Sequence, residues 1–267
     1  MGTMPIPKLL LTMSGPMMIS MFIQALYNVV DSMFVSYISE AALTAVSLAY
    51  PMQNLMIAVA TGTGVGVNAL LSRNLGEKNY SMANRVAGNA IFLGLVSYVV
   101  FALLGLLGSR FYFSVQVEDP NIIALGHDYL SIVTILSIGC FGQVLLSRLL
   151  QSTGKTFYSM VIQMVGAGLN LVLDPIMIFG LLGFPKMGVA GAALATVISQ
   201  LAGTALGIYY NLRKNPEIQF SLSTLRPSKP VISRIYGVGI PSILLQTVSS
   251  VLIFGLNQIL VAFSETA

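Results

Sequence analysis

The chain carries few charges for its length: 8% of its 267 residues are charged, whereas 55% are hydrophobic. A soluble domain carries about 25% charged residues, so this composition excludes a water-soluble globule. The mean hydropathy of +0.84 points the same way. The apolar residues form runs of about 20, which is the length that crosses a bilayer. The sequence therefore predicts an all-α, polytopic transmembrane helical bundle with the lipid bilayer as its solvent.

Motifs for disulfides and for nucleotide binding are also missing. Cys140 is the only cysteine, so no intrachain disulfide can form. Gly62, Gly64 and Gly66 lie inside an apolar run with no strand before them, which favours close helix packing over a dinucleotide loop. The Gly-Lys-Thr triplet that begins at Gly154 lacks the upstream glycine of a phosphate-binding loop. We therefore expect no cofactor, no metal and no ATP hydrolysis by this chain.

A sliding hydropathy window predicts seven apolar spans. They cover residues 9–38, 44–71, 87–108, 128–147, 157–181, 188–211 and 237–262. The polar, proline-containing stretch before the last span predicts a linker that ends in a short interfacial helix. We therefore divide the chain into a six-helix lobe (1–212), a cytoplasmic linker (213–236) and the first helix of a second lobe (237–267).

Basic residues lie almost entirely on one side of the predicted spans. With a cytoplasmic N-terminus, eleven of them fall inside: Lys8, Arg73, Lys78, Arg85, Arg148, Lys155, Arg213, Lys214, Arg226, Lys229 and Arg234. Only Arg110 and Lys186 fall outside. Because cytoplasmic loops are enriched in Lys and Arg, we expect a multi-pass protein of the cell inner (plasma) membrane. The net charge of +4 then reflects topology and indicates no nucleic-acid partner.

Asp31 and Asp174 are the only acidic residues well inside the spans. A carboxylate in hydrocarbon is costly and is usually kept for a function. Other polar residues follow at helical spacings of four, seven or eleven, which place them on shared faces: Gln24 and Asn28 on the first span, Gln163 and Asn170 on the fifth, and Thr196 and Gln200 on the sixth. The sequence therefore predicts a polar cluster between the first, fifth and sixth spans.

Such a cluster has an evident chemistry. Two carboxyl groups close together in a low-dielectric site can bind and release a proton near physiological pH, and a neighbouring amide can hydrogen-bond either form. The alternative is that each aspartate only cross-links helices, which is more credible for Asp174 because Pro175 follows it. Pro16 lies within the first span, where a proline acts as a hinge or as a static kink.

Four segments of the sequence resemble the multidrug and toxic compound extrusion (MATE) family. They are NVVDSMFVSYISEAALTAVSLAYP (28–51), LLSRNLGEKNYSMA (70–83), LLQSTGKTFYSM (149–160) and NLVLDPIMIFGLLGFPKMGVAGAALATVISQ (170–200). They are distributed along the chain from residue 28 to residue 200, in the family's order. The resemblance implies two six-helix lobes related by pseudo-twofold symmetry, with substrate exported against an inward proton or sodium gradient.

The resemblance also assigns roles to individual residues. Asp31 matches the family's first-helix aspartate, and Asn170 and Asp174 match a pair on the fifth helix of its DinF-like branch. Thr196 matches a threonine on the sixth helix. The resemblance implies that these four residues couple transport to a cation and that the first helix bends at Pro16. The other branch, NorM-like, has an acidic residue early in the seventh helix, and residues 241–263 contain none.

The expected function is export of amphipathic organic cations, because two carboxylates favour a positively charged guest. Gln24, Asn28, Gln163 and Gln200 are expected to line the substrate cavity. The family has five further helices in a second lobe, so we expect a missing C-terminal lobe or a second copy as partner. When the sequence is shifted by 225 residues against itself, it shows a weak repeat in which Pro16 aligns with Pro241. Such a repeat is consistent with a transporter built from two duplicated lobes.

Two other functions are open to a chain of this kind. A MATE-related flippase for lipid-linked sugars is expected to have basic residues in its central helices, and the predicted spans contain none. An intramembrane aspartyl protease also needs two membrane aspartates, but neither Asp31 nor Asp174 follows a Gly-x-Gly sequence. The sequence therefore favours a transporter over an enzyme.

Overall fold

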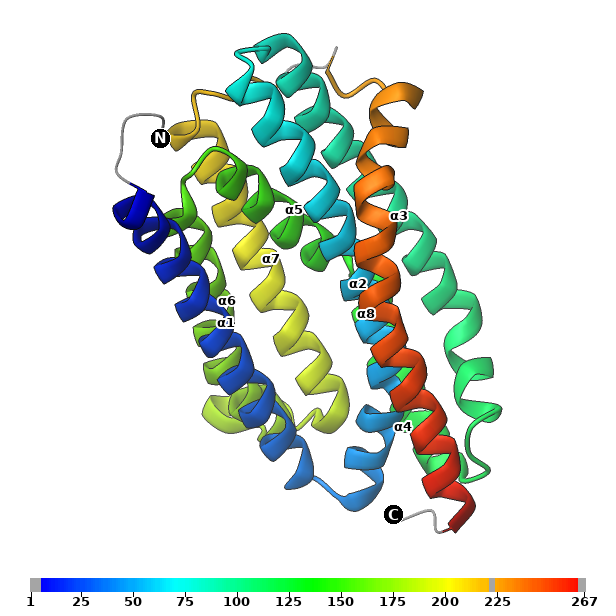
Figure 1. Cartoon of the computed structure of the whole chain (residues 1–267). Helices are drawn as coiled ribbons and strands as arrows, with labels where there is room; N and C mark the ends of the chain where they lie inside the picture. The colour runs from blue at the N-terminus through cyan, green and yellow to red at the C-terminus, as the bar shows by residue number, and fades with distance from the viewer. Residues whose placement is uncertain (1–5, 221–223, 264–267) are drawn as a thin grey trace.

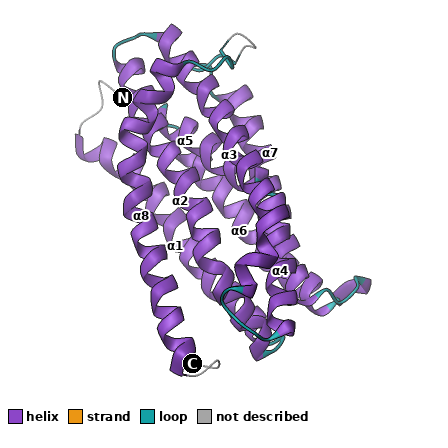
Figure 2. Ribbon diagram, turned by 90° about the vertical axis from the view of Figure 1, so that its right-hand side faces the viewer, coloured by secondary structure: helices purple, strands orange, loops and turns teal. Residues whose placement is uncertain are grey.

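The computed structural model describes residues 6–220 and 224–263, and their regular structure is helical. The helices form an elongated bundle in which successive long helices run in opposite directions (Figure 1; Figure 2). They are α1 (Ile6–Ser36), α2 (Glu40–Gly76), α3 (Tyr80–Ser114), α4 (Pro120–Ile135), α5 (Ile138–Ser152), α6 (Thr156–Phe179), the short η1 (Leu181–Gly183), α7 (Gly188–Lys214) and α8 (Lys229–Phe263). The predicted all-α bundle is confirmed.

Among the described residues, six helices are long and apolar enough to cross a membrane singly, and the bent pair of α4 and α5 meets the same criteria when taken together. Each overlaps one predicted span. The helices α2 and α3 extend beyond the spans because their first turns are capped. Ser39 Oγ accepts the backbone N–H of Ala42 at 3.1 Å, and Asn79 Oδ1 accepts that of Met82 at 3.2 Å.

The span predicted as one helix at 128–147 is two helices. The helices α4 and α5 meet at an angle of 45° across residues 136–137. In the last turn of α4, Thr134 Oγ1 donates to the carbonyl of Leu130 at 2.6 Å, and such a bond back to the preceding turn often bends a helix. After the break, Thr204 of α7 donates to the carbonyl of Gly139 at 2.8 Å. This bond fixes the new direction of α5 against α7.

The predicted linker is shorter than expected, because residues 229–236 form the start of α8 rather than a separate interfacial helix. Pro230 suits the first turn of a helix, where its missing N–H has no partner to lose. Val231 and Ile235 are spaced i, i+4 and are buried against residues of α2 and α3, so packing holds this segment in the helix. Residues 1–5, 221–223 and 264–267 of the predicted units lie outside the described residues.

Two glycines of α2, Gly62 and Gly66, allow α8 to approach closely. A Cβ atom at Gly62 would lie 3.0 Å from the carbonyl oxygen of Gly239, and one at Gly66 would overlap the carbonyl of Ile235. Thr61 Oγ1 also donates to Gln246 Oε1 of α8 at 2.7 Å. The prediction of close helix packing is therefore confirmed, and α8 lies along α2 (Figure 1).

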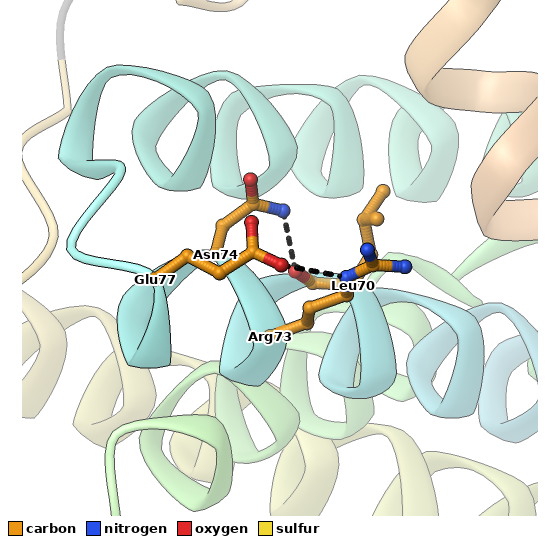
Figure 3. A network of polar contacts seen from close by, with 4 residues as sticks. All are labelled: Leu70, Arg73, Asn74 and Glu77. Carbon is orange, nitrogen blue, oxygen red and sulfur yellow. Dashed lines mark hydrogen bonds and ion pairs between the residues drawn. The ribbon is translucent and has the colours of Figure 1, made fainter.

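The two ends of the bundle differ in charge. The connections α2–α3, α5–α6 and α7–α8 lie at the end where α1 begins (Figure 1), and we call this the basic end. Figure 3 shows the last turns of α2 there, where Arg73 Nε pairs with Glu77 Oε1 at 2.9 Å and Asn74 Nδ2 donates to the carbonyl of Leu70 at 2.7 Å. The other end carries exposed Glu40, Glu118 and Asp128 among its acidic residues.

Candidate functional site

A cavity of about 180 Å³ lies between α1, α2, α5, α6 and α7. Most of the residues that line it have polar side chains, although it lies inside an apolar bundle. Along α5 the wall extends from Cys140 to Gln151, which is about 16 Å at 1.5 Å per residue. Polar walls in a hydrocarbon environment mark a substrate or ion pathway, so this cavity is the candidate site.

Five of the predicted site residues border this cavity. They are Gln24 on α1, Gln163 and Asn170 on α6, and Thr196 and Gln200 on α7. Asn28 does not line it; its side chain is exposed on α1. The helix turns by about 100° per residue, so Asn28 lies about 60° around α1 from Asp31. That angle places it beyond the edge of the face that packs on the bundle.

Asp174 and Asn170 are each 1% exposed and face α7. In the amide orientation that satisfies both neighbours, Asn170 Nδ2 donates to Asp174 Oδ2 at 2.8 Å and Asn170 Oδ1 accepts the backbone N–H of Thr196 at 3.2 Å. Asp31 of α1 lies close to Asp174, and its Oδ1 is buried with no partner among the described residues. The structure therefore brings together the four residues predicted to couple transport to a cation.

Tyr27 joins this acidic cluster to the cavity. Its hydroxyl lies near the Thr196 side chain and Asp31, and both Tyr27 and Thr196 line the cavity. The two aspartates are not among the lining residues, so they lie one layer behind the wall. Sequence reasoning did not select Tyr27, although it lies four residues before Asp31 on the same helix face.

Pro16 lies within α1, and helical residues continue on both sides of it. A proline has no N–H, so Pro16 cannot donate to the carbonyl four residues earlier, which belongs to Thr12. The hydroxyl of Thr156, the first residue of α6, donates to that carbonyl at 3.4 Å. Ser20 Oγ in turn donates to the carbonyl of Pro16 at 2.8 Å. The helix α1 is therefore tied to α6 at the proline.

We expect Thr156→Val to lower the free energy of unfolding by about 0.6 kcal/mol, a typical contribution of an interhelical hydrogen bond in membrane proteins. In a Pro16→Ala background the same change should have almost no effect, because the introduced alanine supplies the backbone N–H that Thr156 replaces. Unfolding of the purified variants in detergent, measured as a double-mutant cycle, checks this. Equal losses in the two backgrounds would show that Thr156 does not compensate for Pro16.

Arg148 corrects the sequence prediction. Hydropathy predicts it in a cytoplasmic connection, but it lies inside α5 and lines the cavity. Its side chain crosses α2 at Gly64, where a Cβ atom would lie 2.7 Å from Arg148 Cγ. A basic residue therefore does border the central cavity, and the predicted absence of such residues no longer argues against a flippase. A hydropathy window misses Arg148 because it lies one turn from the end of α5.

In the described part of the chain, no group of three or more His, Cys, Asp and Glu side chains is placed to hold a metal ion.

Comparison with known proteins gives concordant matches. A family model described as MatE matches residues 16–176. The multidrug export protein MepA of Staphylococcus aureus (strain MRSA252) is 27% identical over 90% of this chain and 53% of its own length. MepA of Staphylococcus haemolyticus (strain JCSC1435) is 28% identical over 97% of this chain and 57% of its own. These relatives are named as exporters and not as enzymes.

The fold is similar to that of solved transporters. A structure of the MATE multidrug transporter DinF-BH matches with a TM-score of 0.92 and 33% identity, over 100% of this chain and 59% of that one. This likeness supports the assignment to the DinF-like branch. The chain spans a little over half the length of the curated relatives.

Proposed function

Because this chain belongs to the MatE family, we propose that it forms the N-terminal lobe of a secondary active multidrug exporter. The exported molecules are amphipathic organic cations, and the driving ion is a proton or sodium. The observation that carries this proposal is the cluster of Asp31, Asp174, Asn170 and Thr196, in which Asn170 and Thr196 line the cavity and the two aspartates lie directly behind its wall.

The cluster can hold a cation in two ways. Asp31 lies close to Asp174, and two neighbouring carboxyl groups in a site of low dielectric can share one proton. When the proton leaves, both carboxylates can attract a cation through Tyr27 and Thr196 at the wall. A drug and a coupling ion that use the same negative charge exclude one another, and this exclusion is the basis of antiport.

The hinge at Pro16 gives the exchange a mechanical route. Asp31 lies on α1 and Asp174 on α6, so loss of the shared proton weakens a contact between these two helices. The same helices meet again at Thr12 and Thr156. Rotation or bending of α1 about Pro16 would then open the cavity to one side of the membrane or to the other.

Dye transport in proteoliposomes tests the proposal. The protein expressed from its complete gene should move a cationic dye against its gradient when an opposing proton or sodium gradient is imposed. An ionophore that collapses the driving gradient, of protons or of sodium, should stop this movement. Dye movement that is the same with and without both gradients would exclude secondary active transport.

We propose a location in the plasma membrane with the basic end in the cytoplasm. This follows the rule that Lys and Arg are retained inside. Because native Cys140 is buried, single cysteines can report the topology. Cysteine at exposed Glu118 should react with a membrane-impermeant maleimide in intact cells. Cysteine at exposed Lys78 should react only after permeabilisation, and the reverse pattern would invert the topology.

The second lobe of the family, or a second copy of this chain, is the proposed partner. In their most apolar windows, α1 and α8 have only 11% and 17% of residues buried, which leaves broad faces for lipid or another lobe. The flippase alternative is less well supported, because the named relatives in the comparisons are multidrug exporters.

A further inference from the structure

Arg148 is the only charged residue among the described residues that line the cavity. The described part of the chain contains one ion pair, Arg73 with Glu77, so Arg148 has no carboxylate partner there. Its Nη1 donates to Gln151 Oε1 at 3.0 Å. A guanidinium has five N–H donors, and a partly buried charge without a counterion is costly. This end of the cavity therefore favours an anionic group.

A second observation points to a ligand at the same place. Ser147, next to Arg148 in the cavity wall, is only 5% exposed, and its Oγ has no hydrogen-bond partner among the described residues. Buried polar atoms in native proteins are nearly always hydrogen-bonded. The Oε1 atom of Gln200, across the cavity on α7, is also buried and unpartnered. Gln200 packs beside Gly139, nearer the acidic cluster, so the Ser147 hydroxyl is the polar group left available beside the guanidinium.

The position of Arg148 relative to the acidic cluster defines the shape of a guest. Cys140 lies near Tyr27, beside the aspartates, and Arg148 is eight residues further along α5. This separation is about 12 Å along the helix axis. The cavity is smaller than the roughly 300–1,000 Å³ of drug pockets, so it encloses a polar part of a guest and leaves the rest outside.

We propose that Arg148, with the Ser147 hydroxyl, binds a carboxylate group on the transported amphiphile. This inference rests on the proposed export function and names a second polar group of its substrate. Arginine presents paired N–H donors that match the two oxygens of a carboxylate. A guest that carries a cationic group and a carboxylate should then bind better than its ester.

Two dyes that differ only at this group test the proposal. Rhodamine 6G is an ethyl ester, and its free acid has the same xanthene cation with a carboxylate. Binding of each dye to the protein from the complete gene, in nanodiscs of neutral lipid, is followed by fluorescence anisotropy. The wild type should prefer the free acid. Arg148→Gln should lower the affinity for the free acid by about tenfold or more, because a charge-assisted hydrogen bond is lost. It should change the affinity for the ester by less than about twofold.

Two further variants separate charge from structure. Arg148→Lys keeps the charge without the paired donors and should retain part of the preference for the free acid. Lys155→Gln removes a positive charge from the same end of the bundle, where Lys155 Nζ donates to Asn215 Oδ1 outside the cavity lining. It should leave the preference unchanged. Size-exclusion profiles confirm that each variant is folded.

Each other result would overturn the assignment. If Arg148→Gln lowers the affinity for both dyes equally, Arg148 has a structural role and does not bind the carboxylate. If Arg148→Gln changes the affinity for neither dye, another group, such as a carboxylate of the second lobe, forms an ion pair with the guanidinium. A free-acid preference that disappears when anionic phospholipid is added would assign the site to a lipid phosphate. If the ester binds and the free acid binds no better, only the carboxylate subsite is wrong. If neither dye binds, the proposed export of cations is contradicted as well.

Discussion

Asp174→Asn is expected to abolish export of cationic drugs while the protein still folds and reaches the membrane. Asp174 is 1% exposed and accepts a hydrogen bond from Asn170 at 2.8 Å. Asparagine has nearly the same shape, but it carries no charge and cannot bind or release a proton. The variant should therefore keep the helix contacts and lose the exchange of proton for drug. Asp31→Asn should have the same phenotype, because the Asp31 carboxyl group lies close to that of Asp174.

Drug susceptibility of cells, with the amount of protein in isolated membranes, checks this prediction. Resistance should fall to the level of cells that lack the gene. Asp128→Asn is the matched control, since Asp128 is an exposed carboxylate outside the cluster, and it should leave resistance unchanged. Normal resistance in the Asp174→Asn variant would remove the coupling role and leave Asp174 as a helix cross-link beside Pro175.

The affinity for a cationic dye is expected to fall as the pH decreases. At high pH the carboxylates of the cluster are ionised and attract the dye, and at low pH protons occupy them. If each dye displaces one proton, the dissociation constant should rise by up to about tenfold for each pH unit. Dye titrations of the protein from its complete gene, in sodium-free buffers from about pH 5 to 8, measure this dependence.

The doubly substituted Asp31→Asn, Asp174→Asn protein is the control for this titration. Its affinity for the dye should be low and nearly independent of pH, because no proton remains for the dye to displace. A flat profile in the wild type would separate the drug site from the proton site. Coupling would then need a conformational route between two distinct sites.

The fold and the acidic cluster were largely predictable from the sequence, because both follow from helical periodicity. Runs of about 20 apolar residues indicate the spans. The spacing between Asn170 and Asp174 places them on one face of α6, and the structure joins them to Thr196 of α7. Predicting that Asp31 lies near these residues also requires that α1 packs against α6. Residue spacing within one helix does not show which helices pack together.

The features that sequence reasoning missed depend on contacts between helices or on helix ends. Arg148 lies one turn from the end of α5, and a hydropathy window averages over more residues than one turn. The break between α4 and α5 depends on hydroxyl bonds made by Thr134 and Thr204. The bond from Thr156 to Thr12 joins residues 144 positions apart. Asn28 shares an approximate face with Asp31, but the packing of α1 leaves it exposed.

The most direct test of the central claim counts the protons released when the dye binds. Rhodamine 6G is added to saturate the wild-type protein in weakly buffered, sodium-free solution, and a pH indicator reports the release. Shared occupancy of the cluster of Asp31 and Asp174 predicts about one proton for each bound dye and no release from the doubly substituted Asp31→Asn, Asp174→Asn variant. Dye binding without proton release, or the same release from the variant, would contradict the account.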